Sequence, residues 1–200
     1  MGASVMHEDA IFPVREAGIP INIRNTNRPN DPGTMIVPSE EQASKPPHHV
    51  TGIAGKKGFS AIYVEKSMMN GQKGFGRRVL QVLEEHNINF EHLPSGIDTM
   101  SVVVNTAELE PERDAVIAAL KKIVDPDKID IFDDLAMIAV VGRGMVRAHG
   151  TAYRVFKALA GVDVNVRMID QGSSELNIIV GINASDYDIA LEAIYKEFVK

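Results

Sequence analysis

The sequence contains no cysteine and no tryptophan, and aromatic residues make up only 6% of its 200 residues. Without cysteine the chain has no disulfide, no thiolate nucleophile and no thiolate metal ligand. It also lacks an apolar run long enough to cross a bilayer, and its amino terminus lacks the basic-then-apolar pattern of a secretory signal. These absences predict a globular cytoplasmic protein with no membrane partner.

Positive charge is in the minority, since 21 basic side chains face 27 acidic ones and the net charge is -6. Surfaces that bind nucleic acid hold its phosphates with an excess of Lys and Arg, so we expect no nucleic-acid partner. The hydrophobic content of 44% is sufficient for one large core or two small ones.

The first 49 residues differ in composition from the rest. Residues 1–38 predict a helix that ends at Glu16, a short strand and a turn region rich in Asn, Pro and Gly. Residues 39–49 have few apolar side chains and read as a linker. Because His48 and His49 have no acidic or histidine cluster beside them, a solvated linker is favoured over a metal site.

Beyond the linker the sequence repeats itself at an offset of 76 residues. This offset aligns glycines with glycines and apolar residues with apolar residues, and we expect it to need no gap as far as Ser101 and Asn177. The matched pairs include Met69 with Met145, Gly74 with Gly150, Val79 with Val155, Leu83 with Leu159 and Gly96 with Gly172. Two modules of one fold are therefore predicted.

Each module has the same order of predicted elements: strand, helix, strand, strand, helix and one further strand. This order is typical of the split βαβ, ferredoxin-like fold, in which two helices cover one face of an antiparallel sheet. The segment "HHVTGIAG", residues 48–55, is an unassigned strand candidate before the first module. The predicted fold class is α+β with two ferredoxin-like modules.

A loop rich in glycine, "NGQKGFGRR" at residues 70–78, precedes the first helix of module one. It lacks the Gly-x4-Gly-Lys-Ser/Thr spacing of a nucleotide-phosphate loop. Its glycines are either simple turn residues or part of a loop at a helix amino terminus, where backbone N–H groups suit the carboxylate of an amino acid. Glu91, Ser95 and Asp98 are then candidates for the ligand's ammonium group, the alternative being ordinary surface carboxylates.

Two long segments carry a resemblance to a known family. "GASVMHEDAIFPVREAGIPINIRNTNRPNDPGT" is similar to the end of an amino-acid kinase domain, and "VTGIAGKKGFSAIYVE" to the entry of a tandem ACT region. The whole chain resembles the carboxy-terminal regulatory part of aspartokinase. This resemblance implies a kinase-domain tail at 1–38, the linker at 39–49, ACT domain 1 at 59–130, and ACT domain 2 at 50–58 and 131–200. The first ACT domain is thus inserted into the second.

The resemblance also implies a function, namely feedback control of aspartate phosphorylation by lysine, threonine or both. Homodimerisation through ACT domains and association with the aspartokinase catalytic domain follow from it, as do ATP and Mg²⁺ as cofactors of the complete enzyme. The implied effector-binding residues are Met69, Gln72, Gly74, Phe75, Phe90, Glu91, Ser95, Gly96 and Asp98.

We assign no catalytic and no metal-binding residue. The family's ATP and aspartate motifs lie upstream of the matched region, and Ser4 stands where the family has lysine. We therefore expect this chain alone to be inactive as a kinase, as a regulatory fragment or a separate regulatory subunit.

Two other classes of function stay open. One is a free-standing amino-acid sensor for another partner. The other is a ferredoxin-like acyl-phosphate hydrolase, with Arg77 or Arg143 as the anion-binding residue. Turnover of an acyl phosphate would favour the hydrolase, and amino-acid binding without turnover would favour a sensor.

Overall fold

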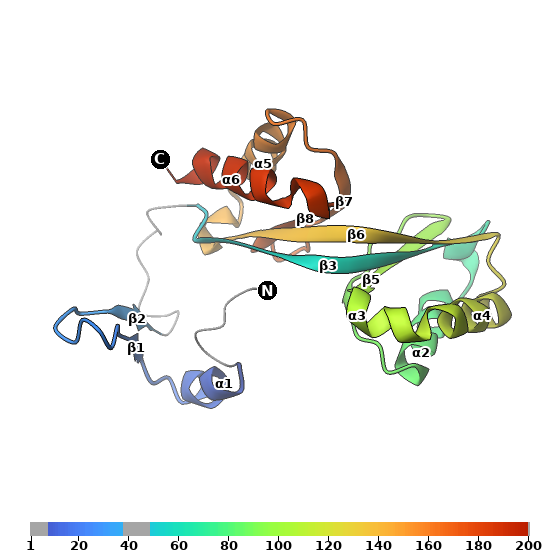
Figure 1. The fold of residues 1–200 in the computed structure, drawn as a ribbon, viewed down its shortest axis with the longest axis horizontal. Coiled ribbons are helices and arrows are strands. Elements are labelled where there is room, and N and C mark those ends of the chain that lie inside the picture. The colour runs from blue at the N-terminus through green and yellow to red at the C-terminus, as the bar shows by residue number, and fades with distance from the viewer. Residues whose placement is uncertain (1–7, 38–48, 200) are drawn as a thin grey trace.

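A computed structural model describes residues 8–37 and 49–199 (Figure 1). Ser4, His48 and the rest of the predicted linker up to residue 48 lie outside the described residues. The amino-terminal segment contains helix α1 (Glu8–Glu16) and the antiparallel strands β1 (Ile21–Ile23) and β2 (Thr34–Ile36).

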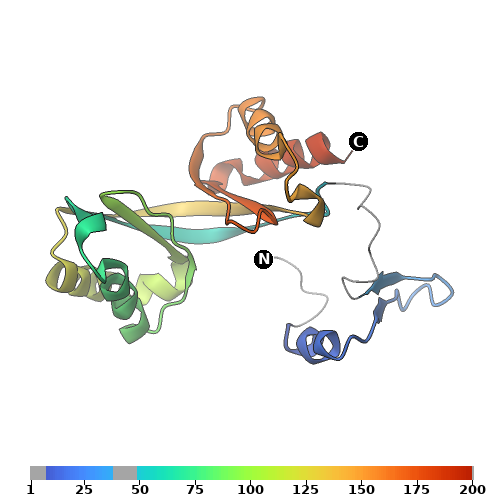
Figure 2. The ribbon, with the colours of Figure 1, turned by 180° about the vertical axis from the view of Figure 1, so that it is seen from behind.

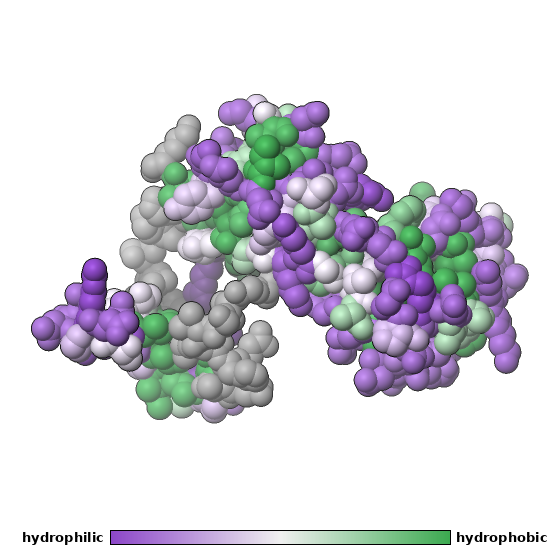
Figure 3. Space-filling model, in the orientation of Figure 1, coloured by the Kyte–Doolittle hydropathy of each residue, from purple (hydrophilic) through white to green (hydrophobic). Residues whose placement is uncertain are grey.

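Apolar side chains of this segment remain on its surface, as the green areas of the segment show in Figure 3. Phe12 is 62% exposed, Ile19 57% and Met35 51%. The described part of the segment therefore has no core of its own.

The remainder of the chain forms the two predicted modules. Module one contains α2 (Phe75–Glu85), β4 (Phe90–His92), β5 (Thr99–Asn105), α3 (Thr106–Leu109) and α4 (Arg113–Val124). Module two contains α5 (Thr151–Ala160), β7 (Val166–Asp170), β8 (Asn177–Asn183) and α6 (Tyr187–Phe198). Two 14-residue strands, β3 (Gly52–Glu65) and β6 (Lys128–Val141), run through both modules.

All six strands belong to one antiparallel sheet in the order β4-β5-β3-β6-β8-β7. The second half of β3 pairs with β5, and the second half of β6 pairs with β8. The two long strands pair with each other from Gly52↔Val141 to Glu65↔Lys128. The first half of β3 therefore completes module two, and the first half of β6 completes module one. This arrangement confirms the α+β fold with the first module inserted into the second.

Both long strands are irregular at the point where they pass between the modules. Gly58 has φ 93° and Asp134 has φ 55°, and these two positions are equivalent under the 76-residue repeat. The β3–β6 register shifts between Lys57 and Phe59 and again between Phe59 and Ala61. A bulge of this kind bends a strand and increases its twist.

The helix pairs lie on opposite outer sides of the β3–β6 pair, as Figures 1 and 2 show from front and back. Alternating side chains of β3 belong to different cores: Ile62 packs with α2 and α4, whereas Phe59 and Ala61 pack with Met137 and Ile179 of module two. The sheet faces that the helices leave uncovered therefore pack against each other and form a third core between the modules.

The repeat requires a gap, contrary to the sequence alignment. Phe90 pairs with Val104, 14 residues later, whereas its equivalent Val166 pairs with Ile182, 16 residues later. The hairpin of module two is thus two residues longer. A shift of two residues keeps every strand side chain on the same face, so the apolar pattern matched without the gap.

Candidate functional site

Each module carries a glycine loop that leads from a long strand into a helix. In module one the loop contains a 3-10 turn, Met69–Gly71, and ends at Gly74, which caps α2 with φ 75°. In module two the equivalent Gly150 caps α5 with φ 84°. Neither helix has a side-chain hydrogen bond at its amino-terminal cap, so a ligand would compete with no capping side chain there.

The turn between β4 and β5 fastens the loop of module one. The Met68 N–H donates to Asp98 Oδ1 at 2.8 Å, and the Asn70 N–H donates to the Ile97 carbonyl at 3.1 Å. Met68 has the uncommon φ of 60°, so the carboxylate of Asp98 supports a strained loop residue. Asp98 is therefore committed to the loop's backbone in this structure.

Charged groups also hold the base of the loop. Lys66 Nζ lies 3.2 Å from Asp125 Oδ2 and 3.6 Å from Asp127 Oδ1, and the Ser67 N–H donates to Asp127 Oδ2 at 2.6 Å. The hydrogen bond to Asp125 raises the pKa of Lys66. The hydrogen bonds from Ser67 lower the pKa of Asp127. These contacts join the end of β3 to the start of β6.

The predicted effector residues near the loop divide into two groups. The side chains of Met69 and Phe75 are 5% and 3% exposed and pack in the core of module one, so only their backbone faces the loop. Ser95 and Gly96 are exposed in the turn that lies against the loop. Gln72 Oε1 accepts a hydrogen bond of 3.4 Å from Arg78 Nη2.

Phe90 and Glu91 lie on β4, before the turn rather than in it. Phe90 is 51% exposed and lines a hollow with Leu83 and Ile88 near the carboxyl end of α2, whereas the glycine loop adjoins its amino end. Glu91 is exposed. The structure thus brings the turn to the loop but places Phe90 in a different hollow.

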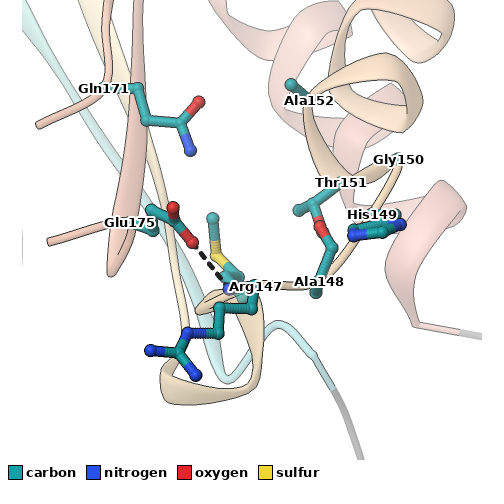
Figure 4. A pocket seen from close by; sticks show the side chains of 9 residues that line it. Arg147, Ala148, His149, Gly150, Thr151, Ala152, Gln171 and Glu175 are labelled. Carbon is teal, nitrogen blue, oxygen red and sulfur yellow. Dashed lines mark hydrogen bonds between the residues drawn. The ribbon is translucent and has the colours of Figure 1, made fainter. Parts of the chain in front are cut away.

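Module two contains a hollow at its own glycine loop that the sequence assignment omitted (Figure 4). Its volume is about 390 Å³, and residues 145, 147–152, 171 and 175 line it. The Arg147 N–H donates to Glu175 Oε2 at 2.6 Å, and Arg147 has φ 59°. This contact repeats the one between Met68 and Asp98. The 76-residue repeat was the sequence signal that pointed to this second loop.

Other candidate chemistry is sparse in the part of the chain that the structure describes. No group of three or more His, Cys, Asp or Glu residues there could hold a metal ion. His49 Nδ1 lies 2.9 Å from the Gly144 carbonyl oxygen. Arg77 donates to Gln81 Oε1 along α2 at 3.1 Å.

No helix within the described ranges is both long and apolar enough to cross a membrane.

Comparison with known proteins agrees with this architecture. The ACT domain family model matches residues 138–198. Aspartokinase 3 of Bacillus subtilis is 40% identical over 198 residues, which cover 98% of this chain and 43% of that protein. The chain thus spans less than half the length of this relative.

Two solved structures have the same arrangement. The aspartate kinase of Clostridium acetobutylicum, described as an allosteric enzyme, superimposes with a TM-score of 0.91 at 46% identity, covering 97% of this chain and 45% of that one. Aspartokinase III of Escherichia coli, solved in complex with lysine and aspartate, gives a TM-score of 0.75 at 19% identity, covering 98% of this chain and 42% of that one. The comparisons confirm the resemblance seen in the sequence: this chain has the sequence pattern and the fold of the carboxy-terminal ACT region of aspartokinases.

Proposed function

We propose that this chain is the regulatory region of an aspartokinase, and that module one binds an amino-acid effector, lysine or threonine, for feedback control of aspartate phosphorylation. The observation that carries the proposal is the start of α2, which lacks a side-chain cap and lies beside the exposed turn at Ser95 and Gly96. Such a helix end suits the ligand's carboxylate. The relative from Clostridium supports regulation, and the lysine complex from Escherichia coli supports the class of ligand.

A second copy of the chain completes the proposed site. Met68 and Ile97 are 76% and 69% exposed at the loop and the turn, and β4 is an edge strand of the sheet. Exposed apolar side chains and an edge strand both favour pairing with another chain. Glu91, exposed on that edge strand, would then reach the ligand's ammonium group from β4.

The catalytic role belongs to the complete enzyme. In this proposal ATP and Mg²⁺ bind the kinase domain, and this chain alone transfers no phosphate. An assay for ATP-dependent aspartyl phosphate formation should give no turnover that rises with the concentration of the purified chain.

Titration calorimetry with lysine and threonine, on a dimer verified by sedimentation, tests the binding site. Glu91→Gln should weaken effector binding about 10- to 100-fold, because it removes a charge-assisted hydrogen bond of roughly 1.5–3 kcal/mol. The matched control is Glu84→Gln, an exposed carboxylate on α2, which should leave the affinity within a few fold. Equal losses in both variants, or no binding of either amino acid, would contradict the proposal.

The equivalent residue in module two, Arg167, is a poorer control than the sequence indicated. Its guanidinium lies 5.4 Å from the centre of the Phe132 ring, and its Nη1 donates to Asn183 Oδ1 at 2.9 Å. Because Phe132 belongs to the half of β6 that completes module one, Arg167→Gln would also change a contact between the modules.

A further inference from the structure

The two edge strands of the sheet meet through their side chains. β4 and β7 stand at opposite ends of the six-strand order, so no backbone hydrogen bond of the sheet joins them. His92 Nδ1 on β4 nevertheless lies 3.1 Å from Asp170 Oδ2 on β7. The sheet is therefore folded so far that its two ends are in hydrogen-bond contact.

This contact lies beside the core between the modules. Met168, two residues before Asp170 on β7, packs against that core, which contains Phe59 and Val103 of module one. The His92 side chain is only 14% exposed and that of Asp170 is 43% exposed. Partial burial lowers the local dielectric, which strengthens a contact between an imidazole and a carboxylate.

The backbone alone holds β4 weakly. The strand has three residues and pairs with β5 only at Phe90 and His92, with an irregularity between these two positions. β7 is longer, with five residues and four paired positions on β8. The His92 side chain thus ties the weaker strand to the better-anchored one.

We propose that the His92–Asp170 pair is a latch that sets the position of β4 and couples the effector site of module one to module two. The coupling rests on the proposed function, because Glu91 is the residue next to His92. With the latch closed, β4 presents Glu91 from a fixed strand. With the latch broken, β4 is free to shift, and the ligand must pay the cost of ordering it.

The latch is tested by measuring the distance between the modules. Since the natural sequence has no cysteine, Glu84→Cys on α2 and Tyr153→Cys on α5 supply the only two thiols for spin labels. Labelled chains diluted with unlabelled protein report distances within one chain by pulsed electron resonance. Asp170→Asn and His92→Gln should each broaden the distance distribution.

Coupling is tested by calorimetry with lysine and threonine on the same variants without labels. Asp170→Asn should weaken effector binding about fivefold or more. The double variant His92→Gln/Asp170→Asn should lose no more affinity than the single variants, because both remove one contact. Asp163→Asn, which removes an exposed carboxylate of module two, is the matched control and should change neither quantity.

Each outcome decides one part of the proposal. Unchanged distance distributions in both single variants would overturn the latch. Broadened distributions with unchanged affinity would overturn the coupling. If the wild-type chain binds neither amino acid, the proposed function and the coupling both fail, and the distances still decide whether the latch exists.

Discussion

At the scale of single residues, the glycine loops are explained by backbone conformation. Gly74 and Gly150 have φ 75° and 84°, in the left-handed region that residues with a Cβ atom adopt at a cost. A Cβ added at Gly74 would come no closer than 3.9 Å to the side chain of Arg77 or Arg78. The requirement for glycine here is therefore conformational rather than steric.

This explanation predicts a difference between two glycines of the same loop. Gly74→Ala should reduce the free energy of unfolding by roughly 1–2 kcal/mol, because alanine must adopt the left-handed conformation. Gly71→Ala, where an added Cβ meets open space, should leave stability unchanged or raise it by about 0.4–1 kcal/mol. Urea unfolding of the two variants measures the difference, and equal stabilities would contradict the conformational explanation.

The candidate site was predictable from the sequence only where position along the chain decides it. The loop, the helix start at Gly74 and the neighbouring turn follow from the repeat and from turn residues. The burial of Met69 and Phe75 does not, because an apolar residue in a loop can face either a ligand or the core. The bond between Asp98 and the Met68 N–H depends on tertiary contact and has no local signal.

At the scale of elements, a polar network holds the bulge where β6 leaves module one. Ser60 is completely buried, and its hydroxyl donates to Asp133 Oδ1 at 2.7 Å. Arg113 at the start of α4 donates two hydrogen bonds to Asp133, at 2.8 and 3.0 Å, and another at 2.7 Å to Glu110. The network fastens α4 to both long strands beside the irregular residue Asp134.

The network predicts a pH dependence of stability. Hydrogen bonds from Arg113, and then from Ser60, lower the pKa of Asp133. A carboxylate whose pKa is lower in the folded state stabilises the protein above the unfolded-state pKa, about 4, and this stabilisation is lost as the pH falls through the folded-state value. Asp133→Asn should therefore cost about 1–2 kcal/mol at pH 7 and progressively less below about pH 4.

Denaturant unfolding of the wild type and Asp133→Asn, repeated between pH 7 and pH 3, checks this dependence. Asp163→Asn, at an exposed position, is the control and should track the wild type throughout. A stability difference for Asp133→Asn that stays constant down to pH 3 would show that the carboxylate's charge is not responsible.

The elements show where sequence patterns stop. Residues 48–55 were recognised as a candidate strand, and the structure places the segment from Gly52 in the same continuous strand as residues 59–65. The bulge at Gly58 conceals this continuity, since it reverses the alternation of buried side chains along β3. Alternation on one side of a bulge therefore cannot predict the other side.

At the scale of the whole molecule, the modules share strands and a core. Phe59 and Val103 of module one and Met137 and Ile179 of module two belong to the same buried cluster. The sequence predicted two modules but not this third core, because its members alternate with residues of the helix-covered cores and carry the same apolar character. Shared strands and a shared core imply that the modules unfold together.

Hydrogen exchange on a core variant tests this cooperativity. Met137 is completely buried, and Met137→Ala should lower the free energy of unfolding by about 2–5 kcal/mol. If the modules unfold as one unit, the amides of β5 in module one should lose as much protection as those of β8 in module two, although Met137 lies on the half of β6 that pairs with β8. Loss of protection in β8 alone would instead show that each module opens independently, and that β3 and β6 connect the modules without making them one cooperative unit.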